Sequence, residues 1–271
     1  MSVKKEPSGR RSIQVEVEVP GTPEEVWRAI ATGPGISTWF VPSEVEEREG
    51  GTMVFHFGPG MDAVAKATAW DPPRRFAATS SDAIPGGPPM ATEWSVEAKG
   101  GGVCVVRVVH SLFASGDDWD DQLESIESGW PAFFAVLRQY LTHFRGQRAA
   151  TFTAMAMAAA PAPKAWDALT GSLGLAGIAA DQRWQTSAAG IELAGLVDRI
   201  RGGEHASAVL RLERPAPGML VLAACPMGAQ ALLSMAFYLY GESAAAAAAR
   251  EEPRWQAWMA AQFPPAQDAP A

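Results

Sequence analysis

The chain has 271 residues, of which 48% are hydrophobic, and its formal net charge is −8. This length suffices for two domains, and the apolar fraction suffices for packed cores. The negative charge argues against nucleic acid or an anionic membrane surface as a partner. No hydrophobic signal segment follows Met1, and the alanine-rich run at residues 244–249 is far shorter than the roughly 20 apolar residues that span a bilayer. We therefore expect a cytoplasmic protein without a membrane span.

The cysteines and histidines do not form a metal motif. Cys104 and Cys225 are far apart and lack CxxC spacing, so we expect buried thiols in a reducing compartment, with a disulfide or metal site as the alternative. The four histidines lack HxxxH and HExxH spacing. The sequence contains no GxSxG, P-loop or strand-borne GxGxxG motif. We expect no cofactor and no metal.

The first elements are a strand and a capped helix. Residues 12–19, SIQVEVEV, alternate apolar and polar side chains, as in a strand with one wet face. Thr22 and Glu25 have the spacing of a capping box, and Pro23 occupies the first helical position. Glu24 and Glu25 are therefore interpreted as residues that start a helix, in preference to a catalytic pair.

A run of strands and a long helix complete the first half. Glycine and proline turns separate strands expected at residues 52–57, 62–70, 74–80, 91–98 and 102–113. An acidic segment containing Asp117, Asp118, Asp120 and Asp121 follows, and its simplest interpretation is a solvated run. Apolar residues then recur every three or four positions, namely Trp130, Phe133, Phe134, Leu137, Tyr140, Leu141 and Phe144. This order predicts an α+β fold, a curved antiparallel sheet wrapped around a long helix.

Six motifs in this order resemble a known family. They are PEEVWRAI after the first strand, WF at residues 39–40, EREGGTMVF, AWDPPRRF, TEWSVEAKGGGVCVVRVVHS and SGWPAFFAVLRQYL. Together, from about Ile13 to Phe144, they resemble the activator-of-Hsp90-ATPase-like branch of the START/Bet v 1 helix-grip (SRPBCC) superfamily. The resemblance implies a six- or seven-stranded sheet gripping the closing helix, with a cavity between them that holds apolar ligands in many members. Carriers, cyclases, hydroxylase domains and co-chaperones share this fold, so it implies no single activity.

One residue departs from the family pattern. Pro131 stands where relatives usually keep a helix former, so we expect a kink or a fresh helix start there.

The second half repeats the pattern of the first. A shift of 139 residues places Ile13 on Phe152 and Trp27 on Trp166. Further strands are expected at residues 181–187, 191–200, 205–213, 219–225 and 231–240, and a last helix at 243–263. These features predict a tandem repeat of one helix-grip unit, with an unrelated α+β domain as the alternative. The second copy is degenerate, because Pro161 and Lys164 replace the capping box.

These patterns define the domain boundaries. We expect helix-grip domains at residues 12–146 and 150–263, between a disordered leader at 1–11 and a disordered tail at 264–271. The basic residues of the leader are interpreted as solvated, in preference to a nucleic-acid-binding arm. We expect the second domain to be structural or regulatory, with a reduced cavity.

The candidate binding site is the space between the sheet and the closing helix of the first domain. Its expected lining is apolar and mostly aromatic, as in known pockets: Trp39, Phe40, Phe55, Phe57, Trp70, Trp94, His110, Trp130, Phe133, Phe134 and Leu137. Glu93, Arg107 and His110 are the candidates for polar contacts. For each aromatic residue taken alone, plain core packing is the alternative.

Three functions fit these features. The preferred hypothesis is non-enzymatic binding of a small apolar or amphipathic molecule by the first domain. The second is a protein-interaction module similar to Hsp90 ATPase activators, which requires an exposed patch on the sheet or the acidic segment around Asp117–Asp121. The third is a cyclase- or hydrolase-like enzyme, which requires a polar pair inside the cavity, and the sequence offers no clear one.

Overall fold

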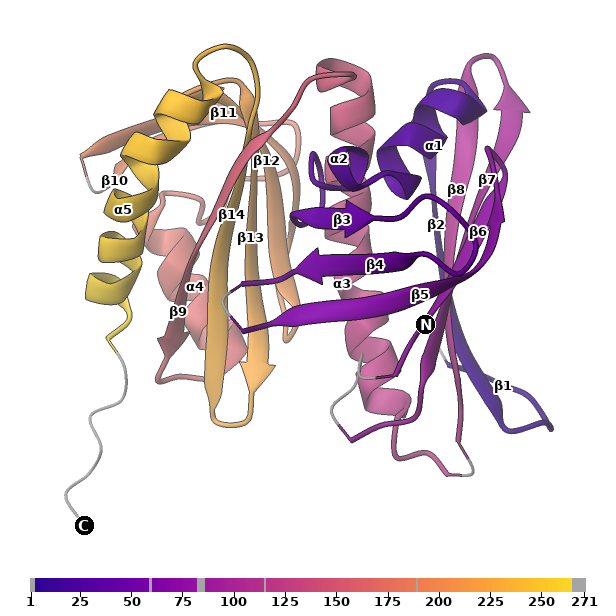
Figure 1. The fold of residues 1–271 in the computed structure, drawn as a ribbon. Helices are drawn as coiled ribbons and strands as arrows, with labels where there is room; N and C mark the ends of the chain where they lie inside the picture. The colour runs from indigo at the N-terminus through magenta and orange to yellow at the C-terminus, as the bar shows by residue number, and fades with distance from the viewer. Residues whose placement is uncertain (1–2, 59, 82–85, 115, 189, 265–271) are drawn as a thin grey trace. The chain divides into compact units, whose positions relative to one another are not determined.

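The computed structural model describes residues 3–58, 60–81, 86–114, 116–188 and 190–264 (Figure 1). The chain divides into two compact units, Met1–Gly146 and Gln147–Ala271. Each unit contains an antiparallel sheet and a long helix after it, which confirms the predicted α+β fold class. The tail expected at residues 265–271 lies outside the described residues. None of the described helices has the length and apolar character needed to cross a membrane.

The first unit is an eight-stranded sheet with the order β1-β2-β8-β7-β6-β5-β4-β3, which curves around helix α3 in Figure 1. The strands are β1 (Lys4–Lys5), β2 (Arg10–Pro20), β3 (Ser43–Val45), β4 (Thr52–His56), β5 (Asp62–Asp71), β6 (Arg75–Ser80), β7 (Met90–Gly100) and β8 (Val103–Phe113). The helices are α1 (Pro23–Ala31), α2 (Gly33–Ile36), α3 (Asp120–Gln139) and the π-helical turn η1 (Tyr140–Phe144).

The start of α1 is fixed by the predicted capping box. Thr22 Oγ1 accepts a hydrogen bond from the backbone N–H of Glu25 at 3.3 Å, and Glu25 Oε2 accepts from the backbone N–H of Thr22 at 2.9 Å. These bonds satisfy two of the backbone donors that a helix start leaves unpaired. Glu24 and Glu25 therefore serve the helix start, where the helix dipole favours negative charge.

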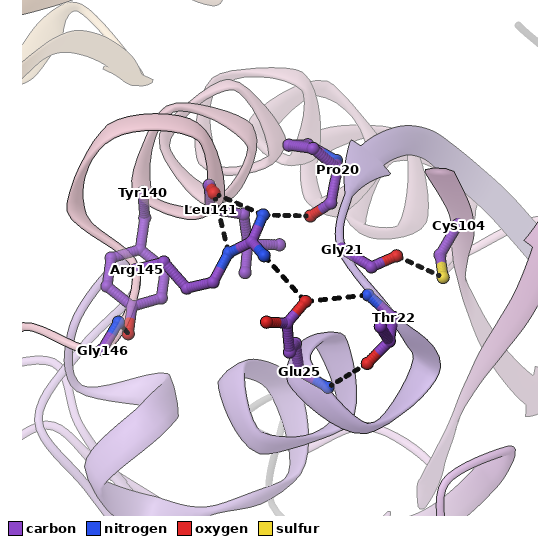
Figure 2. A network of polar contacts seen from close by, with 9 residues as sticks. All are labelled: Pro20, Gly21, Thr22, Glu25, Cys104, Tyr140, Leu141, Arg145 and Gly146. Atoms are coloured by element: carbon purple, nitrogen blue, oxygen red, sulfur yellow. Dashed lines mark hydrogen bonds and ion pairs between the residues drawn. The ribbon is translucent and has the colours of Figure 1, made fainter. Parts of the chain in front are cut away.

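The closing helix is tied to this capping box at its far end (Figure 2). Arg145 Nη1 donates to Glu25 Oε2 at 2.7 Å, and its guanidinium also reaches the carbonyl oxygens of Pro20 and Leu141. The thiol of Cys104 donates to the carbonyl oxygen of Gly21 at 3.3 Å. The hydrogen bond from Thr22 and the Arg145 guanidinium keep the pKa of Glu25 below its usual value. The Glu25 carboxylate and the Arg145 guanidinium together thus link the end of β2, the start of α1 and the end of η1.

Of the two alternatives expected at Pro131, a kink or a fresh helix start, the second does not occur. Helix α3 begins at Asp120 and continues through Pro131 to Gln139, so no fresh helix starts at the proline. A proline removes one backbone hydrogen bond, and a long helix that packs on its sheet tolerates this loss. Helix α1 ends at Ala31, and Thr32 then caps the short helix α2 by accepting from the N–H of Gly35.

The expectation of a disordered leader at residues 1–11 is corrected for the described residues, because residues 4–5 and 10–11 belong to paired strands. Lys4 and Lys5 form β1, which pairs with Ser12 and Arg11 of β2. The Arg11 guanidinium lies 2.5 Å from Asp120 Oδ1 and 2.6 Å from Asp117 Oδ1. The sequence had suggested two solvated runs, one basic and one acidic. Lys5 and Arg11 of the basic run instead pair with Asp117 and Asp120 of the acidic run, and Arg11 holds the pKa of the Asp117 carboxyl below its usual value.

The second unit repeats the strand order of the first. It contains β9 (Ala150–Ala158), α4 (Ala162–Ser172), β10 (Arg183–Ala188), β11 (Ile191–Arg201), β12 (Ala206–Arg214), β13 (Gly218–Met227), β14 (Gln230–Leu239) and α5 (Ala244–Gln262). Its sheet has the order β10-β11-β12-β13-β14-β9. In the first unit β2 pairs with the last strand β8, in the second β9 pairs with the last strand β14, and the preceding strands follow in reverse chain order in both sheets. The first sheet also has β1 beside β2 and one strand more at its opposite edge. This shared topology supports the tandem-repeat interpretation.

Candidate functional site: a cavity in the first unit

A cavity of about 390 Å³ lies between the sheet and α3 of the first unit. Strands β4 to β8 supply one wall through residues two positions apart, such as Phe76 and Ala78 on β6 or Met90, Thr92 and Trp94 on β7. This spacing follows from the alternation of side chains along a strand. Helix α3 supplies the other wall through residues three or four apart, as expected for one helix face. The two-residue period of the strands and the three-to-four-residue period of the helix therefore determine which side chains line the cavity.

The structure brings most of the predicted site residues together. The cavity is lined by Trp39, Phe40, Phe55, Phe57, Trp94, His110, Trp130 and Phe133. Three others lie outside its lining. Trp70 packs edge-on against Trp27, Phe134 lies behind Trp94 and Trp130, and Leu137 is fully buried. These three residues are packed among side chains of the first unit.

Phe40 is the central ring of the lining. Its ring centroid lies 4.6 Å from that of Phe133 in a T-shaped arrangement and 5.6 Å from that of Trp130 in a stacked one. Phe57 meets it edge-on at 5.7 Å. Offset and edge-to-face contacts of this kind each add to the stability from area burial alone. The sequence pair WF at residues 39–40 thus joins the loop after α2 to both walls of the cavity.

The cavity opens beside the β4–β5 hairpin. Phe57 lines the cavity, yet 45% of its surface is exposed, and Met61 across the same hairpin is 47% exposed. Trp39, at the inner end, is only 1% exposed, and its Nε1 donates to the carbonyl oxygen of Ala29. The apolar side chains therefore change from exposed at the opening, at Phe57 and Met61, to fully buried at the inner end, at Trp39.

One chain of hydrogen bonds crosses this apolar lining. Trp130 Nε1 donates to His110 Nε2 at 2.8 Å, and His110 Nδ1 lies 2.9 Å from Thr92 Oγ1. The His110 and Trp130 rings are stacked, with centroids 5.6 Å apart. The chain joins β7, β8 and α3, so it also fixes the distance between the sheet and the closing helix.

Burial sets the charge state of His110. Desolvation lowers the pKa of His110 to about 4, because burial disfavours the charged imidazolium. At neutral pH the ring is uncharged and has one donor and one acceptor nitrogen. Both nitrogens are engaged, one by Trp130 and the other by Thr92.

The two charged residues that were expected to contact a ligand lie on the opposite face of the sheet. Glu93 forms an exposed ion pair with Arg75 at 2.7 Å, and Arg107 forms one with Glu16 at 2.9 Å. Each has the strand parity opposite to that of Trp94 and His110, so its side chain points away from the cavity. That part of the sequence interpretation is wrong.

The sequence interpretation missed several lining residues that are not aromatic. They include Ile30, Ile36, Met53, Ala63, Ala65, Ala78, Ser80, Met90, Thr92, Ser125 and Ile126. Thr92 was identifiable, because it stands two residues before Trp94 on the same strand and therefore on the same face. The place of Ser80 in the lining was harder to predict from the sequence. Its hydroxyl group donates to the carbonyl oxygen of Val64 at 2.7 Å.

The second unit has apolar residues in place of this polar chain. In the first sheet His110 lies between its cross-strand neighbours Ile13 and Thr92. In the second sheet Phe237 lies in the same way between Phe152, the counterpart of Ile13, and Leu220. Phe237 stacks on Phe152 at 4.5 Å and packs near Trp255 of α5. The buried Trp255 Nε1 has no hydrogen-bond partner among the described residues. At these positions the second unit therefore has two phenylalanines where the first has isoleucine and histidine, and a leucine where the first has threonine.

No group of three or more metal-ligating side chains occurs within the described parts of the chain. Cys104 is buried and Cys225 is exposed, and both are free thiols. The expectation of two buried thiols is thus wrong for Cys225.

Comparison with known proteins gives one family match. The family described as "Activator of Hsp90 ATPase homolog 1-like protein" matches residues 20–142. No curated protein shows significant similarity to the chain.

Solved structures with a similar fold include single-domain and two-domain proteins. The di-domain ARO/CYC protein BexL from the BE-7585A biosynthetic pathway is 16% identical, with 92% of this chain and 98% of that chain covered and a TM-score of 0.44. DynU16, a putative protein in the dynemicin biosynthetic locus, is 16% identical, with coverages of 93% and 96% and a TM-score of 0.42. Aha1 from Colwellia psychrerythraea is 20% identical, with coverages of 50% and 98% and a TM-score of 0.43.

Proposed function

We propose that the first unit, whose residues 20–142 match the family described as "Activator of Hsp90 ATPase homolog 1-like protein", binds a small apolar or amphipathic molecule between its sheet and α3. The observation that carries the proposal is the cavity of about 390 Å³ with a mostly aromatic lining and one internal polar chain. Small-molecule sites have this character, in which apolar walls hold the ligand and a few polar groups orient it.

The apolar lining supports a modest affinity. A ligand that buries about 300 Å² of apolar surface gains about 7 kcal/mol at 25 cal/mol per Å². Association costs at least about 4 kcal/mol in lost freedom of motion. Apolar burial alone thus leaves weak binding, and additional affinity depends on the internal polar chain or on aromatic contacts with Phe40 and Phe133.

The chemistry of the lining favours binding over acid–base catalysis. His110 is the one titratable side chain among the described residues that line the cavity. Its two nitrogens are already hydrogen-bonded, and burial holds it neutral at neutral pH. A general acid or base instead needs a pKa near the working pH and access to the substrate proton. We therefore assign His110 a role in orienting other groups.

The protein-partner alternative has less support from the acidic segment than the sequence suggested. Asp117 and Asp120 are paired with Lys5 and Arg11 of the same chain. Internal pairing reduces the negative field that a basic partner would recognise.

A cavity-filling substitution tests the proposed function. Ala65 lines the cavity, whereas Ala91 is exposed on β7 and does not. We expect Ala65→Leu to weaken binding of the neutral fluorophore N-phenyl-1-naphthylamine at least tenfold, because the added side chain occupies ligand space. The matched variant Ala91→Leu should bind it as the wild type does. Equal binding by all three proteins, with circular dichroism showing intact folds, would place the fluorophore elsewhere and refute the proposal.

A further inference from the structure

We propose that the ligand presents a hydrogen-bond acceptor, of the carbonyl class, to the hydroxyl group of Thr92. This inference rests on the proposed function and specifies the ligand chemistry at the same site. It follows from the direction of each hydrogen bond in the chain that crosses the cavity.

The hydrogen bond between Trp130 and His110 fixes the donor–acceptor direction of the whole chain. The indole nitrogen of a tryptophan carries a proton and has no acceptor capacity, so Trp130 Nε1 must donate to His110 Nε2 at 2.8 Å. His110 Nε2 is then the acceptor nitrogen of the ring. In a neutral imidazole the other nitrogen bears the proton, so His110 carries its proton on Nδ1.

The second bond therefore runs from His110 to Thr92. His110 Nδ1–H donates to Thr92 Oγ1 at 2.9 Å, and the hydroxyl oxygen is the acceptor. A hydroxyl group that accepts in this way still has its own proton to donate. Among the residues that the structure describes, none accepts this proton, and Thr92 lines the cavity. The chain Trp130, His110 and Thr92 thus ends in an O–H donor at the ligand space.

The environment supports this assignment of the proton. His110 is 6% exposed, and burial lowers its pKa to about 4, so the ring stays neutral at neutral pH. The other hydroxyl group on the sheet wall of the cavity, that of Ser80, already donates to the carbonyl oxygen of Val64. Thr92 is therefore the donor that the sheet wall offers to a ligand.

The surroundings of Thr92 define the ligand class further. Its strand neighbour two residues on is Trp94, and the rings of Trp94 and Trp130 meet edge-on at 5.2 Å. A carbonyl attached to a flat ring system satisfies the Thr92 proton and places its ring among these aromatics. A hydrocarbon of the same shape leaves the proton unpaired. The site therefore fits a flat apolar ring system that carries a carbonyl oxygen as its hydrogen-bond acceptor.

A pair of isosteric probes tests this inference on the full chain. The probes are 2-acetylnaphthalene, which has a carbonyl oxygen, and 2-isopropenylnaphthalene, which has a CH₂ group in its place. Their dissociation constants are measured by displacement of N-phenyl-1-naphthylamine from the wild type, Thr92→Val and Thr92→Ser. Thr92→Val removes the hydroxyl group while keeping the side-chain shape, and Thr92→Ser retains the hydroxyl group.

We expect Thr92→Val to weaken binding of the ketone about fivefold and to leave binding of the hydrocarbon unchanged, and we expect Thr92→Ser to bind the ketone as the wild type does. In the wild type the infrared carbonyl band of the bound ketone should lie at lower frequency than in an alkane. If both probes bind the wild type but Thr92→Val affects them equally, the carbonyl inference falls and the proposed function stands. If the carbonyl band is unshifted in the wild type, the inference also falls, whatever the stability of the variants. If neither probe binds the wild type, the proposed function falls with it.

Discussion

The buried neutral His110 predicts a specific loss of stability in mild acid. In the unfolded chain a histidine has a pKa of about 6.5, whereas burial lowers the pKa of His110 to about 4 in the folded protein. The unfolded state therefore binds more protons between these two values, and stability falls as the pH drops from 6.5 towards 4. The linkage relation gives a loss of about 2 kcal/mol between pH 7 and pH 5, which increases to about 3 kcal/mol at pH 4.

The variant His110→Gln isolates this contribution. Glutamine does not titrate, and its amide oxygen can accept from Trp130 Nε1 in place of the imidazole nitrogen. The rest of the chain is the same in both proteins, so its contributions cancel in the difference. We expect the wild type to lose about 2 kcal/mol more than His110→Gln between pH 7 and pH 5.

The assay must report on the first unit separately, because a chain with two units need not unfold in one step. Urea series at each pH, followed by a hydrogen-exchange pulse at fixed pH and mass spectrometry of peptides from β7 and β8, provide this resolution. Nuclear magnetic resonance titration of the His110 ring gives its pKa directly. A pKa near 6.5, or equal pH dependence in the two proteins, would show that His110 is solvated and would refute the reasoning.

Three further predictions concern the fold around the site. Thr22→Ala should destabilise the first unit by about 1 kcal/mol, because it removes the capping hydrogen bond to Glu25, and Thr22→Ser should cost much less; urea unfolding measures both. Gly51→Ala should destabilise the first unit by roughly 2 kcal/mol or more, because its Cβ would lie 2.1 Å from the carbonyl oxygen of Glu46. Gly101→Ala meets no atom within 4 Å, so it should cost only about 1 kcal/mol for its positive φ. Equal thermal stability of the two variants would contradict this expectation. Trp130→Phe should lower the free energy of unfolding of the first unit by about 1–2 kcal/mol more than Trp255→Phe lowers that of the second. The first change leaves His110 Nε2 unpaired, whereas the second removes an N–H that is already unpaired. Pulse labelling with peptides from each unit measures both values.

The sequence predicts the framework of both units because their signals are local. The alternation in residues 12–19 matches β2, and the heptad-like aromatic stripe after residue 130 matches the inner face of α3. The shift of 139 residues that relates Ile13 to Phe152 recovers the strand order of the second unit, although its capping box is lost. Periodicity and turn residues carry this information without knowledge of the tertiary contacts.

The remaining features depend on partners that are distant in the sequence. The pairing of Arg11 with Asp120 structures the leader, and the two residues are 109 positions apart. The polar role of His110 depends on Trp130 from another element, whereas Glu93 and Arg107 look equally suitable in the sequence but lie on the outer face of the sheet. Residue type suggests a polar contact, but strand parity decides which polar side chain reaches the cavity.

The most direct test of ligand binding in the cavity is a titration of the ¹⁵N-labelled full chain with 2-acetylnaphthalene, followed through the tryptophan indole N–H signals. The account predicts saturable shifts of the signals from Trp39, Trp94 and Trp130, which line the cavity, and unchanged signals from Trp166 and Trp184 of the second unit. Shifts confined to the second unit, or no saturable shift at any indole, would contradict the claim that the first unit holds the ligand between its sheet and closing helix.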